Sequence, residues 1–159
     1  MRMFSFTLVQ KIEAHSEQIA NQVAEEVRKD PQLNRMRTLD HEDLPRRAKE
    51  LLENLGQWLV AKDPEIAGWS ESLGRARCER SIPLHELIRA LQIVKSRLIE
   101  FTREGMAETA MQIYAEEELE YRVGRFFDEV IYHSAKGYES AMRELLREGG
   151  RVPVGSSAR

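Results

Sequence analysis

Residues 73–91 read LGRARCERSIPLHELIRAL, and this stretch decides the fold class. Two arginine-bearing turns that end near Arg77 lead through a short polar corner into a strongly amphipathic segment. Ser81 is placed to cap that segment ahead of Pro83, and proline is well accepted in the first turn of a helix. The stretch therefore predicts two helices joined by a tight corner.

Beyond the corner, apolar residues recur at helical spacing down to a stop near Gly105. Such a pattern gives one buried stripe and an opposite polar face that is exposed to solvent. The predicted stripe comprises Leu84, Leu87, Ile88, Leu91, Val94, Leu98 and Phe101. The predicted exposed face carries His85, Glu86, Arg89, Gln92, Lys95 and Arg103.

The same periodicity predicts three helices before the corner, over residues 8–29, 44–59 and 63–79. The first ends at Asp30-Pro31, because a residue before proline is driven out of the α region. Asp40 or Asp43 is expected to cap the second, and Asp63 the third.

The last predicted helix begins within residues 116–118 and ends within residues 143–147, a length of roughly 45 Å that outreaches the others. Residues 106–115 form a junction before it, for which a helical conformation is left open. The tail over residues 149–159 has no apolar period, so we expect it to be disordered. The sequence thus predicts an all-α bundle of about five helices in one domain over residues 1–148, with globin-like helix crossings as one option.

Composition narrows the class of protein. Positive and negative residues are interspersed and the net charge is −3, whereas a nucleic-acid surface clusters its basic residues. Polar residues from Gln10 onward interrupt the apolar start, so we expect neither a signal peptide nor a membrane span. The lone Cys78 favours a reducing cytoplasm, and it is expected to be a packing residue rather than a redox switch.

The sequence offers no catalytic constellation and no metal motif. The four histidines have no pair at i, i+4 spacing, so we expect no metal site and no cofactor. Haem is the alternative, with His133 as its axial ligand beside Phe126, Phe127 and Tyr132.

Three arginines around the corner are the candidate ligand-binding residues. Arg75, Arg77 and Arg89 could converge on a small anion near the unpaired amides of a helix start. The competing interpretation, which we favour, is a set of ion pairs with Glu71, Glu79 or the acidic start of the last helix. Exposed pairs of that kind contribute only about 0 to 1 kcal/mol each and need no functional explanation.

The corner, with its arginines and its Leu84-His85-Glu86-Leu87 helix start, resembles the N-terminal sensory domain of RsbR/RsbRD-type co-antagonists of the RsbT switch kinase. The Leu44-Pro45 junction and the leucines after it fit the second helix of that family, so the resemblance covers roughly residues 6–145. It implies a regulatory domain that does not catalyse, with RsbT-type kinases, anti-sigma or STAS circuits, or histidine-kinase outputs as partners. Such proteins usually continue into a STAS or kinase module, and we expect that module to be absent after the short tail here.

We therefore expect a non-enzymatic sensory domain that signals through its last helix. A haem or small-ligand carrier and a purely structural dimerisation module are the alternatives. The apolar stripe of the last helix is longer than its neighbours can cover, which predicts a parallel homodimer through the first and last helices. Phe127, Val130 and Ala141 are the predicted interface residues.

Overall fold

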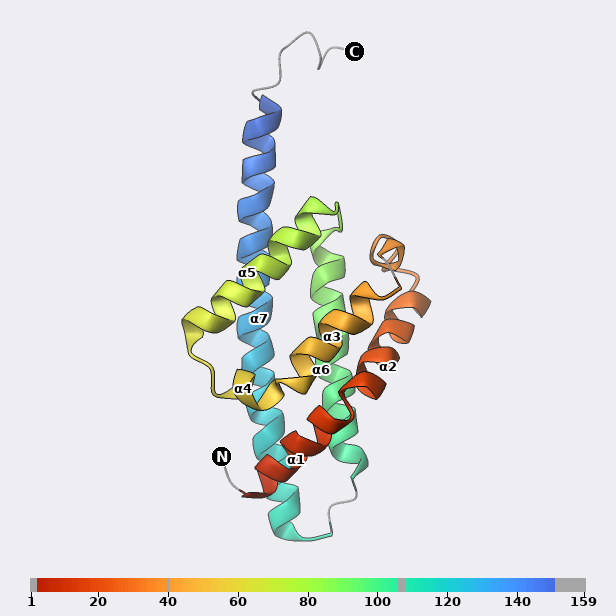
Figure 1. The fold of residues 1–159 in the computed structure, drawn as a ribbon, viewed down its shortest axis with the longest axis vertical. Coiled ribbons are helices and arrows are strands. Elements are labelled where there is room, and N and C mark those ends of the chain that lie inside the picture. Colours follow the sequence, from red (N-terminus) through yellow and green to blue (C-terminus); the bar gives the residue numbers. More distant parts are fainter. Residues whose placement is uncertain (1–2, 40, 106–107, 151–159) are drawn as a thin grey trace.

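The computed structural model describes residues 3–39, 41–105 and 108–150, and every regular element within them is a helix (Figure 1). The elements are α1 (Met3–Ala14), α2 (Ser16–Lys29), the 3-10 helix η1 (Met36–Thr38), α3 (Asp43–Glu53), α4 (Leu55–Leu59), α5 (Asp63–Glu79), α6 (Leu84–Glu104) and α7 (Ala110–Gly150). The all-α class and the long C-terminal helix are therefore confirmed.

Two of the predicted helices are each divided by a short break. The helix predicted over residues 8–29 breaks at His15, whose Nδ1–H donates to the carbonyl of Lys11 at 2.7 Å. The helix predicted over residues 44–59 breaks at Asn54, whose side-chain amide donates to the carbonyl of Glu50 at 2.8 Å. In both places the side chain donates a hydrogen bond to a backbone carbonyl in the last turn of a helix, where intrahelical partners are missing. Helical periodicity continues across each break, and for this reason it did not reveal them.

The helices surround one apolar core. In Figure 1, α6 and α7 run antiparallel and α5 crosses α7 obliquely. Among the described residues, the α5–α7 contact is the most extensive between two helices. On the other side, α2 packs against both α3 and α6. The largest fully buried apolar side chains are Ile12, Ile19, Leu33, Met36, Leu52, Leu55, Ile82, Leu87, Leu98, Leu119 and Phe127.

Glycines let α5 and α7 approach until their backbones touch. A Cβ at Gly74 would overlap the carbonyl oxygen of Ser134, and a Cβ at Gly137 would overlap the backbone of Glu71. Ser70 of α5 and Ser134 of α7 are fully buried beside them. Small residues at this crossing therefore bring the two helix axes close together.

The α5–α6 corner ends α5 with a Schellman motif rather than capping α6. Ser81 N–H donates to the carbonyl of Cys78 and Ile82 N–H donates to that of Arg77, both at 3.0 Å. Ser81 has φ of 58°, the left-handed conformation that this motif requires and that glycine usually supplies. The expectation that Ser81 caps the next helix is therefore wrong. Tyr138 O–H of α7 donates to the Ile82 carbonyl at 2.7 Å and fixes the corner to the long helix.

Other predicted ends lie close to the observed ones. Asp63 and Asp43 are each the first residue of their helix instead of the cap, while Asp40 lies outside the described residues. Helix α7 begins at Ala110, several residues earlier than predicted, and it includes Gly149 and Gly150, which the sequence assigned to the tail. The rest of the predicted tail lies outside the described residues.

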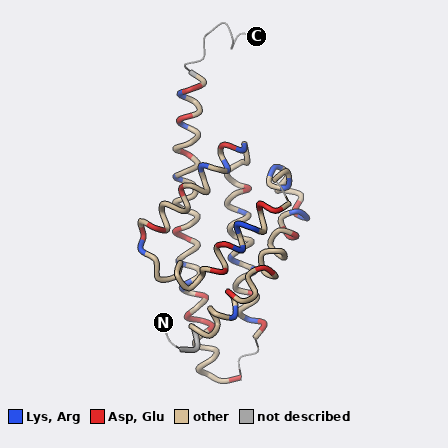
Figure 2. Tube along the Cα trace, in the orientation of Figure 1, with Lys and Arg blue, Asp and Glu red and all other residues tan. Residues whose placement is uncertain are grey.

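Helix α7 leaves the bundle at its C-terminal end (Figure 1). Lys and Arg alternate with Asp and Glu along the helices without separating onto one side in the view of Figure 2. Within the described part of the chain, no helix combines the length and the apolar character that crossing a membrane requires.

Candidate functional site

The central polar feature of the interior is an ion pair between Arg77 of α5 and Asp43 of α3. Arg77 Nη1 donates to Asp43 Oδ2 at 2.9 Å, and the two side chains are only 5% and 13% exposed. Arg46 and Arg47, also on α3, donate to Asp43 Oδ1 at 3.2 and 3.4 Å. One carboxylate is thus shared by three guanidinium groups.

The electrostatics of this cluster favour a further anion. The pKa of Arg77 lies below its usual value: burial is the largest influence and lowers it, Asp43 raises it, and the like charges of Arg47 and Arg80 lower it further. Burial alone would raise the pKa of Asp43, but its arginine partners outweigh burial and hold that pKa below the usual value. Arg77 Nε is buried without a hydrogen-bond partner, an arrangement that buried polar groups rarely keep.

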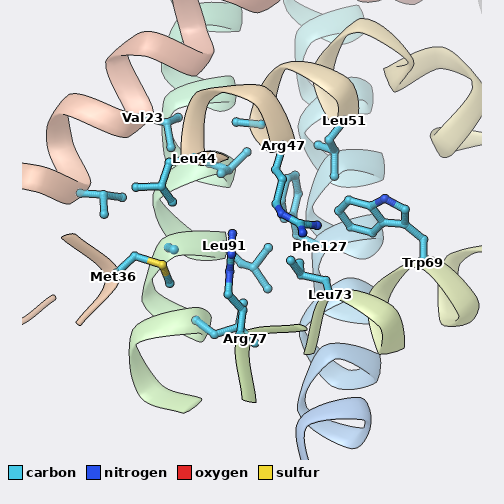
Figure 3. A pocket seen from close by; sticks show the side chains of 15 residues that line it. Val23, Met36, Leu44, Arg47, Leu51, Trp69, Leu73, Arg77, Leu91 and Phe127 are labelled. Carbon is cyan, nitrogen blue, oxygen red and sulfur yellow. The ribbon is translucent and has the colours of Figure 1, made fainter. Parts of the chain in front are cut away.

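Beside the cluster lies an apolar cavity of about 60 Å³ (Figure 3). The side chains of Arg77 and Arg47 enter it from opposite sides. Its other walls come from α2, η1, α3, α5, α6 and α7 and are predominantly apolar: Val23, Val27, Met36, Leu44, Ala48, Leu51, Trp69, Leu73, Leu87, Ala90, Leu91, Val94 and Phe127. The site therefore combines an apolar chamber with two cationic groups.

Glu86 holds one wall of the cavity in place. It is 2% exposed, and its Oε1 accepts the backbone N–H groups of Arg35 at 2.9 Å and Met36 at 3.2 Å. A carboxylate that accepts two backbone N–H groups fixes the start of η1, and with it the Met36 side chain. The prediction that Glu86 belongs to the exposed face of its helix is wrong.

The three predicted ligand-binding arginines do not converge. Arg75 forms a two-bond ion pair with Glu144 of α7, at 2.7 and 3.2 Å, and Arg77 turns toward α3. Arg89 is exposed and lies on an open groove together with Glu26 and Asp30. Arg75 and Arg77 therefore form ion pairs, with Glu144 and Asp43 in place of the expected glutamates. Of the three arginines, Arg77 lines the cavity.

Phe127, Val130 and Ala141, the predicted dimer-interface residues, are 0%, 0% and 2% exposed within the single chain. Helices α5 and α6 both pack against α7 and leave these side chains no free surface. In this fold an interface would have to use other residues, and the apolar side chains exposed near the end of α7 are Met142, Leu145 and Leu146.

His133, the candidate haem ligand, does not line the cavity. Its ring lies between two acidic side chains, with Nε2 at 3.4 Å from Glu129 and Nδ1 at 3.9 Å from Glu71. Within residues 3–39, 41–105 and 108–150, no three His, Cys, Asp or Glu side chains are grouped to hold a metal ion. Cys78 is buried, and burial raises the pKa of its thiol, as suits a packing residue.

Sequence reasoning missed Arg47 and Glu86 and treated Asp43 only as a cap. Two signals were present in the sequence. Arg77 follows Leu73 by four residues and so continues the apolar stripe of its helix, and Glu86 shares its helix face with Ile93, seven residues later. The pairing with Asp43 had no local signal, because the partners lie 34 residues apart.

These features define an all-α domain in which an ionic cluster adjoins an apolar cavity and one long helix leaves the core. The chain matches the family model described as the RsbT co-antagonist protein rsbRD N-terminal domain over residues 17–152, and it belongs to that family. The resemblance and the regulatory class that it implied are thereby confirmed, and the family is one of stress-signalling regulatory domains. Neither the comparison with curated proteins nor the comparison with solved structures gave a match.

Proposed function

We propose that this chain is a non-enzymatic sensory domain of the cytoplasm that passes its signal to a partner through α7. The observation that carries the proposal is the dual position of α7. Phe127 and Val130 lie fully buried in the core, whereas every residue from Met142 to Gly149 is exposed. A change in the core that shifts α7 therefore reaches its exposed end along one continuous helix.

The contacts of α7 with α5 support this route. Backbone contact at Gly74 and Gly137 leaves little room for independent motion, and the Arg75–Glu144 pair joins the helices again near the exit from the core. Packed elements of this kind move between discrete positions rather than deform gradually.

The proposal includes a parallel homodimer formed by the projecting ends of α7. Met142, Leu145 and Leu146 are 39%, 44% and 69% exposed, and their spacing of three and four residues puts them on one side of the helix. Such a stripe suits pairing with a second copy of the same helix. Parallel pairing would bring both C-terminal ends to one place, where an output module could respond to their separation.

The family supplies the class of downstream partner. Its description refers to co-antagonists of RsbT, so we propose an RsbT-type kinase, or an anti-sigma or STAS circuit, as the output. The mixed charge of the projecting helix gives no support to a nucleic-acid partner.

The test is a double substitution, Leu145→Asp with Leu146→Asp, with mass measured by light scattering at tens of micromolar protein. We expect the unmodified chain to have twice the chain mass of 18.4 kDa and the variant to be monomeric, because charge buried at an apolar interface is strongly unfavourable. The melting temperature of the core should change little, since both leucines are exposed.

The control is Ser140→Asp with Arg143→Asp, which places two acidic groups at exposed positions of the same helix and, because Arg143 is cationic, makes the chain one unit more negative than the leucine variant does. This control should remain dimeric and should still capture an RsbT-type kinase, and the leucine variant should do neither. A monomeric unmodified chain, or equal behaviour of the two variants, would contradict the proposal.

A further inference from the structure

We propose that the cavity bounded by α3, α5 and α6 binds a small aliphatic monocarboxylate, whose charged group is held by Arg77 and Arg47. The proposal rests on the sensory function proposed above and names the class of its signal. It assigns a ligand to a site that lies apart from the exposed end of α7.

The positive charge of the site favours an anionic ligand. Asp43 is a single carboxylate shared by Arg46, Arg47 and Arg77, so positive charge is in excess beside the cavity. Arg77 is more than nine-tenths buried, lines the cavity, and has an Nε–H without a partner. A carboxylate oxygen is the acceptor that best satisfies a guanidinium N–H, since guanidinium and carboxylate form short, charge-assisted bonds.

The apolar walls of the cavity favour a ligand whose remaining part is apolar. Apart from the two arginines and the indole N–H of Trp69, the side chains that line the cavity are apolar, so a hydroxyl O–H on the ligand would find no acceptor and a second charge no counter-charge. A dianion such as phosphate is disfavoured for the same reason, and an amine would be repelled by the guanidinium groups.

The volume limits the length of the acid. A cavity of about 150 Å³ holds benzene with its six carbons, so the 60 Å³ here suits an apolar body of about two or three carbons. Propionate and butyrate therefore fit, whereas aromatic and long-chain acids do not.

The position of the cavity connects the ligand to α7. Phe127 of α7 and Leu73 of α5 both line it, and each is buried in the contact between those helices and the core. A ligand that fills the cavity therefore presses on the long helix directly, without an intervening element.

The experiment is titration calorimetry of the full chain with sodium propionate at constant ionic strength, with sodium chloride as the balancing salt. We expect saturable binding of propionate and butyrate, and none of n-butanol or propylamine, which have similar apolar bodies without the carboxylate. Arg47→Gln should weaken binding by about tenfold or more, the loss expected for one charge-assisted hydrogen bond.

The matched control is Arg46→Gln. Arg46 and Arg47 are neighbours on α3 and both contact Asp43, but Arg47 lines the cavity and Arg46 does not. We expect the Arg46 variant to bind propionate within about twofold of the unmodified chain, which separates ligand binding from a general loss of positive charge. Ala90→Met, which fills the cavity from α6 without altering charge, should abolish binding.

Absence of propionate and butyrate binding, or equal weakening by the two arginine variants, would overturn the carboxylate proposal. The dimer and kinase measurements on the leucine variant do not depend on this ligand, so they decide the proposed function separately. If propionate binds as expected while the leucine variant still dimerises, the ligand site is supported and the proposal that α7 ends form the dimer is contradicted.

Discussion

At the scale of single residues, the carboxylate of Asp43 neutralises the positive charge of the buried Arg77. Replacing it by Asn would retain a hydrogen-bond acceptor but leave the charge of Arg77 without its partner in the interior. Breaking a buried ion pair from one side typically costs about 3 kcal/mol or more. We expect Asp43→Asn to lower the free energy of unfolding in urea by that amount, and Asp128→Asn, at an exposed position of α7, to have almost no effect.

The same residue gives the stability a dependence on pH. Because the pKa of Asp43 in the folded chain lies below its ordinary value of 3.8, its contribution is complete above that pH and is lost as the pH falls through the lower folded value. Below about pH 4 the difference between the unmodified chain and Asp43→Asn should therefore shrink. A difference that stays constant from neutral pH to pH 3 would exclude this origin.

Individual residues also show what the sequence could and could not reveal. Arg77 was named from the sequence as a candidate, but its partner Asp43 was not, because the pairing joins helices far apart in the chain. Glu86 was assigned to the wrong face because charged residues are rarely buried. The backbone N–H groups that donate to it, those of residues 35 and 36, come from a segment without periodicity.

At the scale of elements, the α5–α7 crossing depends on two glycines. Gly74→Ala and Gly137→Ala each add a methyl group where the facing helix backbone already lies. Backbone cannot move aside as a flexible side chain can, so we expect each variant to lose about 3 kcal/mol or more in a urea titration.

The chain supplies a control for each helix. Gly68 of α5 and Gly124 of α7 have nothing within 4 Å of an added Cβ. Alanine there should raise stability by up to about 1 kcal/mol, because alanine favours helix more than glycine does. Similar effects at all four glycines would show that helix propensity, and not contact between the helices, decides the outcome.

The elements themselves were largely predictable from periodicity. Helices α5 and α6 begin and end within a residue or two of the predicted bounds, because Pro64, Pro83 and Gly105 mark their ends. The breaks at His15 and Asn54 were missed, and Ser81 was assigned to the wrong helix, because a serine in the left-handed conformation replaces the usual glycine.

At the scale of the whole molecule, the long helix connects the interior to the surface. Its 41 residues correspond to about 60 Å, and its buried side chains run from Ala115 to Ala141. The sequence predicted this length in part but placed the interface on Phe127, Val130 and Ala141, which the core already covers. Burial depends on how all the helices pack together, and a single apolar stripe does not reveal which of its residues remain free.

The most direct test of the proposed route is the distance between spin labels on the projecting ends of α7, introduced by Glu148→Cys and measured by pulsed electron resonance. Cys78 is buried, so the unmodified chain serves as the labelling control. Two parallel helices pack with their axes about 10 Å apart, so we predict one narrow distance distribution below about 30 Å. The absence of any dipolar signal, or a distribution centred above about 50 Å, would contradict the proposal that two projecting α7 ends pair and carry the signal out of the molecule.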